Sequence, residues 1–319
     1  MNRDFSLEIN NKEKLKYLLS RDKHAILEGV CTEHLFQNDV LPRKKWNNKI
    51  SLGWWTTRQN NDYIFFKVSS EYVTQNDISI FRHFIKNNMK CIYVKFENTG
   101  TYKFLEVNSN IYLIEKNNYI EQFLSFNEFI IKYNLKEIRQ PLLAANDVRD
   151  TARQEKAIDF FDKNGLLEDT AIQRHFANFF LTVYYGYAVW NIDGLLVDND
   201  KVLAYEIKFK YPTKSNTFGL NIGVAKLFEW LHNKDIKIYH AILLNPTNSE
   251  KVSVLDVLSN KSLYRETNWI CYRINPTNLF NSSGIAPSKT QIEGRTDQKV
   301  VYIPVSNFKY LKNLEYKNA

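Results

Sequence analysis

Hydrophobic and polar positions along the chain predict two successive regions of helices and short strands. In the first region, residues 1 to about 45 are polar and helical, and Pro42 ends that helical pattern because proline cannot continue a helix. Aromatic and β-branched runs then indicate strands, and apolar residues at helical spacing indicate the helices between them. The expected order is strand, helix, strand, strand, strand, helix, at 63–66, 78–85, 91–94, 102–107, 111–114 and about 119–134.

A polar break at 146–150 leads into the second region, and we place a domain boundary near residue 145. Two helices open this region, and the first is closed by Asn164-Gly165, where glycine suits the left-handed position after a helix. A single strand is then expected to turn at 198–201 and return as a second strand. The helices of this region are expected at 151–163, from about 169 and at about 219–233. The strands are expected at 187–197, 202–209 and 236–244, and a polar loop-forming stretch at 275–299.

Composition limits the classes of protein that remain. The 319 residues are 44% hydrophobic, enough for the cores of two domains. Lys and Arg number 43 against 35 Asp and Glu, and the net charge of +8 favours a polyanionic partner, although base bias in the encoding genome explains such a composition equally well. The three cysteines show no CxxC spacing, and no segment approaches the roughly 20 apolar residues of a membrane span. We therefore expect a soluble cytoplasmic protein with reduced thiols and no membrane partner.

The predicted hairpin brings two carboxylates together. If Asn199 and Asp200 are the central residues of its turn, Asp198 pairs with Lys201, and counting outward places Asp193 opposite Glu206. That position belongs to the class of pairs that are not hydrogen-bonded, in which the Cα atoms approach to about 4.5 Å. Two acidic side chains would then face each other at short range.

These acids end an otherwise apolar face, because Glu206 and Lys208 point to the same side as Val202 and Ala204. Opposed carboxylates repel each other unless something compensates their charge, and a divalent cation fits such oxygen ligands. We expect Mg²⁺, with Mn²⁺ as a substitute. Lys208 would lie beside the ion, where it could position or deprotonate a water molecule or stabilise charge on a phosphate. A metal that activates water is what phosphodiester hydrolysis at neutral pH requires.

At this point the stretch 150–245 resembles the PD-(D/E)XK nuclease superfamily. The match is Ile192-Asp193-Gly194, then twelve residues, then Glu206-Ile207-Lys208, followed by a helix and a strand; Ile192 replaces the proline of the motif. The resemblance implies an α/β fold with a restriction-endonuclease-like mixed sheet flanked by helices in the C-terminal half, beside an N-terminal α+β accessory domain. It also implies an Mg²⁺-dependent endonuclease in which Asp193 and Glu206 bind the metal and Lys208 is the catalytic lysine. Glu168, on the preceding helix, is the candidate for a further acidic ligand.

Other residues have both a functional and a purely structural interpretation. Lys210, Lys214 and Lys226 would extend a basic nucleic-acid-binding surface, although each alone is more simply a solvated lysine. His240 is interpreted as a core histidine with satisfied hydrogen bonds. The tryptophans could stack bases, but core packing is the better interpretation for Trp46, Trp54 and Trp55.

The elements at 63–94 follow the order seen at 203–244, with Lys67 near the position of Lys208 and Phe65 where Glu206 would be. We interpret this similarity as chance; were it structural, the first copy would lack a metal and suit binding.

The resulting prediction is a two-domain enzyme. Residues 1–145 would form a recognition or regulatory domain, and 146–319 a domain that hydrolyses DNA phosphodiester bonds. The expected partner is nucleic acid, DNA rather than RNA, and a homodimer is left open. The alternatives are a nucleic-acid-binding protein without turnover and an effector-sensing interaction factor that uses the same fold.

Overall fold

The computed structural model describes residues 6–40, 50–59, 61–108, 110–111, 114, 122–138, 150–186, 188–287 and 297–311. Two compact units divide the chain. The first unit consists of Met1–Asp22, Ile50–Leu143 and Phe161–Val197, and the second of Lys23–Lys49, Ala144–Phe160 and Asp198–Ala319. This interleaved division differs from the single boundary expected near residue 145, because helices remote in sequence pack onto each sheet.

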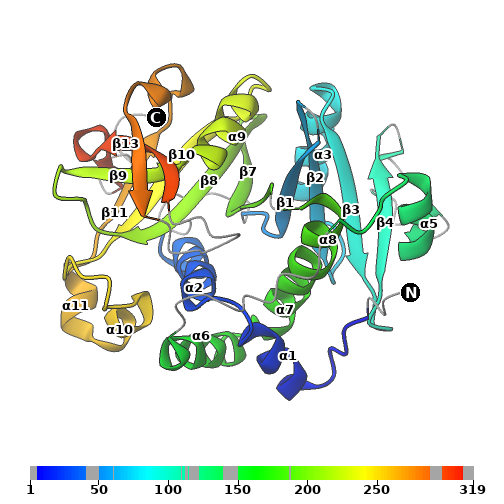
Figure 1. Ribbon diagram of the computed structural model, residues 1–319, viewed down its shortest axis with the longest axis horizontal. Coiled ribbons are helices and arrows are strands. Elements are labelled where there is room, and N and C mark those ends of the chain that lie inside the picture. Colours follow the sequence, from blue (N-terminus) through cyan, green and yellow to red (C-terminus); the bar gives the residue numbers. More distant parts are fainter. Residues whose placement is uncertain are drawn as a thin grey trace. The chain divides into compact units, whose positions relative to one another are not determined.

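The first unit contains a six-stranded sheet of order β5-β4-β3-β2-β1-β6, with helices on both faces (Figure 1). Its strands are β1 (Trp54–Gln59), β2 (Asp62–Ser69), β3 (Lys90–Phe96), β4 (Tyr102–Val107), β5 (Leu124–Ser125) and β6 (Val189–Ile192). Its helices are α1 (Lys12–Leu19), α3 (Gln75–Lys86), α5 (Phe126–Lys132), α7 (Leu167–His175), the π-helical η3 (Phe176–Leu181) and α8 (Thr182–Tyr185). The helix α6 (Thr151–Lys163) contains residues of both units.

Aromatic side chains fix the helices on the two faces of this sheet. Trp54 of β1 packs against Phe81 of α3, while Phe66 of β2 packs against Phe176 of η3. Trp54 lies opposite Lys67 in the β1–β2 register, so Trp54 and Phe66 point to opposite faces. Six successive residues of β2 are buried, which is the pattern of a strand covered on both sides.

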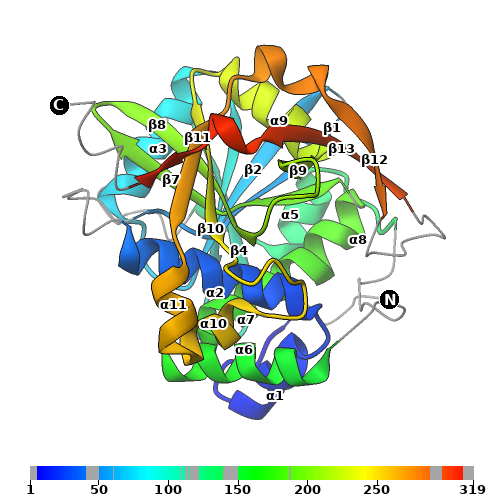
Figure 2. The same ribbon diagram turned by 90° about the vertical axis from the view of Figure 1, so that its left-hand side faces the viewer.

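The second unit contains a five-stranded sheet of order β14-β11-β10-β8-β7 and a three-stranded sheet of order β12-β13-β9. Strands β8, β10 and β11 lie side by side in both ribbon views (Figure 1, Figure 2). The strands are β7 (Gly194–Asp198), at which the chain passes from one unit to the other, β8 (Lys201–Lys210), β9 (Thr217–Asn221), β10 (Lys237–Leu244), β11 (Trp269–Arg273), β12 (Ser283–Pro287), β13 (Asp297–Pro304) and β14 (Lys309–Tyr310). The helices are α2 (His24–Asp39), α9 (Ile222–His232), α10 (Val254–Ser259), α11 (Lys261–Glu266) and the 3-10 helices η4 (Pro276–Asn281) and η5 (Val305–Asn307).

Helix α2 covers one face of the five-stranded sheet. Phe36 of α2 contacts the rings of Tyr205 on β8 and Trp269 on β11. Glu206 follows Tyr205 along β8 and therefore points to the opposite face. The site residues are thus held by a strand whose other face is sealed by an apolar contact.

Both units contain the same order of strand, strand, helix, strand, strand. In the first unit this is β1-β2-α3-β3-β4, and in the second it is β7-β8-α9-β10-β11, with β9 inserted before the helix. In each, the second and third strands pair in parallel and the third and fourth pair antiparallel. The similarity noted in the sequence therefore extends to the strand topology, and its interpretation as chance is not tested by the structure.

The strand positions correct the alignment of the two copies. Lys67 is the sixth residue of β2 and Glu206 the sixth of β8, so Lys67 corresponds to Glu206 rather than to Lys208. The parallel partner of Lys67 is Tyr93, the fourth residue of β3, and that of Glu206 is His240, the fourth residue of β10. The comparison of β2 with β8 and the comparison of β3 with β10 therefore both align Lys67 with Glu206.

Several predicted elements are confirmed, including the helix at 151–163, the positive φ of 68° at Gly165 and the buried strand at 237–244. Others are wrong. Ile111 and Ile114 are helical rather than extended, and part of the loop expected at 275–299 forms the edge strand β12. The strand expected at 187–197 is two strands, because Val189–Ile192 pairs with β1 in one sheet and Gly194–Asp198 belongs to the other.

The structure also bears on the predictions for the cysteines, the tryptophans and membrane-spanning helices. Cys31, Cys91 and Cys271 are buried free thiols, and Trp54 and Trp55 are buried as core packing requires. Trp46 lies outside the described residues. None of the described helices combines the length and apolar content that a membrane span needs.

Candidate functional site

The residues Glu206 and Lys208 form an ion pair on strand β8. The Lys208 ammonium nitrogen lies 3.0 Å from Oε1 of Glu206. The Glu206 side chain is only 8% exposed, while that of Lys208 is 31% exposed. The carboxylate is therefore buried while the lysine reaches solvent, and the two side chains share a face as the sequence predicts.

Asp193 lies at the point where the chain leaves one sheet for the other, between Ile192 of β6 and Gly194 of β7. It is 1% exposed, and the side-chain amide of Asn191 donates a hydrogen bond of 2.7 Å to its Oδ1. Two backbone hydrogen bonds between Ser51 and Leu195 fix the following residues. Asp193 is thus a buried carboxylate on a backbone held from both sides.

The turn between β7 and β8 has the predicted conformation. Asn199 and Asp200 have φ values of 47° and 60°, the two successive left-handed residues of a type I′ hairpin turn. Strand β7 ends at Asp198 and β8 begins at Lys201, so the residues that flank the turn are those expected to pair. The predicted opposition of Asp193 and Glu206 starts from this turn, and the distance between their carboxylates stays a prediction.

His240 contradicts its interpretation as a satisfied core histidine. It is fully buried on β10, and neither ring nitrogen has a hydrogen-bond partner among the described residues. Its ring meets Phe308 edge-on at 5.6 Å between centroids, and it is the parallel-strand neighbour of Glu206. Burial, together with the nearby charges of Lys210 and Lys208, lowers the pKa of the imidazole well below its ordinary value. The ring is therefore neutral, the form in which histidine binds metals.

The remaining predicted residues differ in exposure. Lys210 donates a hydrogen bond of 2.7 Å to the carbonyl oxygen of Gly219, while Lys214 and Lys226 are exposed. Glu168 is exposed in the first turn of α7, where partial burial and then the charge of Asp169 raise its pKa. Across the described residues, no three side chains drawn from His, Cys, Asp and Glu gather closely enough to hold a metal ion. The structure therefore does not bring Glu168 together with Asp193 and Glu206 as a three-residue ligand set.

The first unit holds a different polar cluster at the equivalent place. Lys67 lies 3.2 Å from Oδ1 of Asp77 and donates a hydrogen bond to Ser51 at 3.1 Å. Ser51 in turn donates to Asp77, and Thr74 donates two hydrogen bonds to the second carboxylate oxygen. Burial alone would raise the pKa of Asp77, but Lys67, Ser51 and Thr74 together lower it below its ordinary value. This cluster satisfies its own charges.

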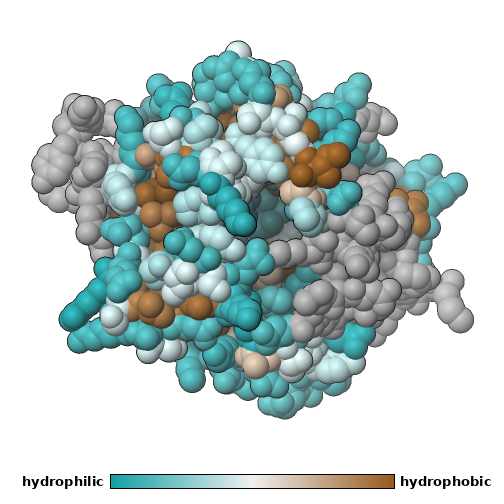
Figure 3. Space-filling model, turned by 60° about the vertical axis from the view of Figure 1, so that its left-hand side comes forward, coloured by the Kyte–Doolittle hydropathy of each residue, from teal (hydrophilic) through white to brown (hydrophobic). Residues whose placement is uncertain are grey.

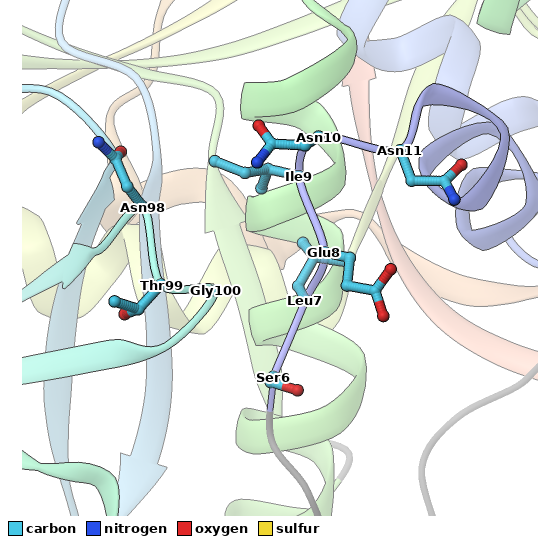
Figure 4. Close-up of a pocket in the computed structure, with 9 residues that line it drawn as sticks. All are labelled: Ser6, Leu7, Glu8, Ile9, Asn10, Asn11, Asn98, Thr99 and Gly100. Atoms are coloured by element: carbon cyan, nitrogen blue, oxygen red, sulfur yellow. The ribbon is translucent and has the colours of Figure 1, made fainter.

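A pocket in the first unit lies apart from the residues discussed so far. A pocket of about 350 Å³ lies in the first unit, and Figure 4 shows Asn98, Thr99 and Gly100 across it from the segment Ser6–Asn11, with the carboxylate of Glu8 pointing away from them. The face in Figure 3 is mostly hydrophilic, with hydrophobic residues in small separate patches.

Comparison with known proteins adds no relative: no family model matches the sequence, and no curated protein or solved structure matches it.

Proposed function

We propose that the chain is a metal-dependent endonuclease that hydrolyses DNA phosphodiester bonds, with a restriction-endonuclease-like arrangement around β7, β8, α9 and β10. The observation that carries the proposal is the buried Glu206 carboxylate paired with Lys208 on β8. A buried carboxylate beside a fully buried imidazole that has no hydrogen-bond partner among the described residues is a donor set that fits a divalent cation.

Asp193 and Glu206 would hold the ion, and water and phosphate oxygens would complete its coordination, as is usual for Mg²⁺ at phosphate sites. Asn191 orients the Asp193 carboxylate through its 2.7 Å hydrogen bond. The bound ion would supply Lewis acidity and a water of lowered pKa. Without it, the ion pair with Lys208 balances charge at Glu206.

Lys208 has a second role in this proposal. When a cation takes over the charge of Glu206, the ammonium group would turn toward the phosphate or the attacking water, because it lies at the more exposed end of the pair. There it would stabilise the negative charge that develops during hydrolysis. A neutral side chain of the same length could not do so.

The DNA would approach along a basic surface. The exposed Lys214 and Lys226 lie on the same unit as Lys208, and the whole chain carries a net charge of +8. Phosphate contacts of this kind position the backbone without reading its sequence. Binding should therefore weaken steeply as salt rises.

The test is nicking of supercoiled plasmid DNA by the purified chain with Mg²⁺, and with Mg²⁺ plus excess EDTA, beside an RNA substrate of matched length. The proposal expects nicking and linearisation of DNA that EDTA abolishes. Tight DNA binding with no cleavage under any divalent cation would instead favour a nucleic-acid-binding protein without turnover.

A further inference from the structure

His240 and Glu206 are lateral neighbours on the same face of the five-stranded sheet. They are paired in the parallel register of β10 and β8, and paired residues point to the same side. Tyr205, next to Glu206, stacks on Tyr239, next to His240, with 5.5 Å between the ring centroids, which confirms the alternation of faces. The imidazole and the carboxylate therefore project from adjacent backbones in one direction.

Burial of the imidazole costs free energy, because no described residue forms a hydrogen bond with it. Both of its nitrogens lack hydrogen-bond partners there, and the ring is 0% exposed. Buried polar groups are nearly always hydrogen-bonded, so such an exception points to a bound water, an ion, a ligand or a functional role. A phenylalanine or leucine would fill the same space without that cost.

The equivalent positions of the first unit provide an internal comparison. There, Tyr93 stands in the place of His240, and its hydroxyl donates a hydrogen bond of 3.0 Å to the carbonyl oxygen of Glu71. Lys67, in the place of Glu206, is paired with Asp77 and Ser51. The shared topology thus allows both positions to be satisfied internally. In the second unit, neither ring nitrogen of His240 has a hydrogen-bond partner within the part of the chain that the structure describes.

We infer that His240 supplies a nitrogen ligand beside Glu206 and that this site takes a divalent transition-metal ion such as Mn²⁺ in preference to Mg²⁺. This inference rests on the metal site of the proposed function. Imidazole nitrogen is a common ligand of transition metals, whereas Mg²⁺ prefers oxygen. Two ligands of one ion need not approach within hydrogen-bonding distance of each other, so an unbonded pair of neighbours is the arrangement expected before the ion binds.

The experiment is pulsed electron paramagnetic resonance of Mn²⁺ bound to the full chain, prepared without a histidine tag. A coordinated imidazole gives a ¹⁴N modulation, which changes when the protein is made with ¹⁵N-histidine. This isotope exchange needs no substitution, so it does not depend on how a variant folds. His240→Leu, Glu206→Gln and the control His232→Asn, on the exposed end of α9, are compared with the wild type.

The inference predicts ¹⁴N modulation in the wild type and in His232→Asn, its loss in His240→Leu, and Mn²⁺ binding weakened at least tenfold in His240→Leu. Mn²⁺ binding that Glu206→Gln abolishes, but that shows no nitrogen modulation, would overturn the role of His240 and leave the metal site of the proposed function intact. Nitrogen modulation that persists in His240→Leu would also overturn it. No Mn²⁺ binding at all would overturn this inference together with the proposed metal site.

Discussion

Lys67 and Glu206 occupy equivalent positions, the sixth residue of β2 and of β8, in two regions with the same strand order, and their charges are opposite. Lys67 is held by Asp77, Ser51 and a backbone carbonyl, all within its own unit. Glu206 forms an ion pair with Lys208, and its neighbour on the next strand is His240, which has no hydrogen-bond partner among the described residues. The same strand order therefore carries a Lys67–Asp77 ion pair in one unit and a Glu206–Lys208 ion pair beside His240 in the other.

The ion pair of Lys67 and Asp77 should stabilise the folded protein. Lys67→Met and Asp77→Asn should each lower the free energy of unfolding by about 3–5 kcal/mol, because each leaves its partner charge buried and uncompensated. The double variant should lose clearly less than the sum of the two. Urea denaturation of the four proteins measures this coupling, and strictly additive losses would show that the two side chains do not interact.

Asp77 should also make this contribution dependent on pH. Its folded pKa is lowered from the unfolded value of 3.8, so the ionised form is favoured in the native state. The stabilisation is therefore present above pH 3.8 and is lost as pH falls through the folded pKa. The difference in unfolding free energy between wild type and Asp77→Asn should shrink below pH 3.8. A difference that stays constant from pH 6 to pH 2.5 would contradict this assignment.

His240→Leu should stabilise the metal-free protein. The substitution removes a buried imidazole that has no partner among the described residues and fills its space with apolar atoms of similar volume. Removal of such an unsatisfied polar group should raise the free energy of unfolding by about 1–3 kcal/mol. Thermal unfolding in EDTA measures the gain, with His232→Asn as the control at an exposed position. A loss of stability would mean that the imidazole is satisfied in solution.

Helix α2 should be essential to the second unit although it is far from the rest of that unit in sequence. Phe36 is 1% exposed and contacts both Tyr205 and Trp269 behind the site. Phe36→Ala should therefore cost about 3–5 kcal/mol by leaving a cavity. Tyr17→Ala, at a side chain that is 67% exposed, is the control and should cost little. Equal effects of the two substitutions would show that α2 does not support the sheet.

Local sequence signals predicted the parts of this structure that local chemistry determines. Asn199-Asp200 specified a left-handed turn, and Asn164-Gly165 specified the end of α6, because few other residues tolerate positive φ. The β8, α9 and β10 elements followed from their apolar periodicity. The Glu206–Lys208 pair followed from alternation along a single strand.

Local sequence signals did not predict the features that depend on residues far apart in the chain. The residues on either side of Asp193 have an unbroken strand pattern, and only pairing with β1 reveals that the strand changes sheets there. His240 was placed in an apolar strand correctly, but its missing partners depend on what surrounds it in three dimensions. Nor could the packing of α2 on Tyr205 be inferred from the polar surroundings of residues 23–39.

The most direct test of the nuclease assignment is the single-turnover rate of DNA cleavage with saturating Mg²⁺ or Mn²⁺ for the wild type, Glu206→Gln and the exposed control Glu229→Gln on α9. Asp193→Asn and Lys208→Met accompany them, and combinations should lose little more than single changes because these groups act as a unit. The account predicts cleavage by the wild type and Glu229→Gln, and a loss of at least about a thousandfold in Glu206→Gln with the fold retained. Cleavage by Glu206→Gln at the wild-type rate would contradict it.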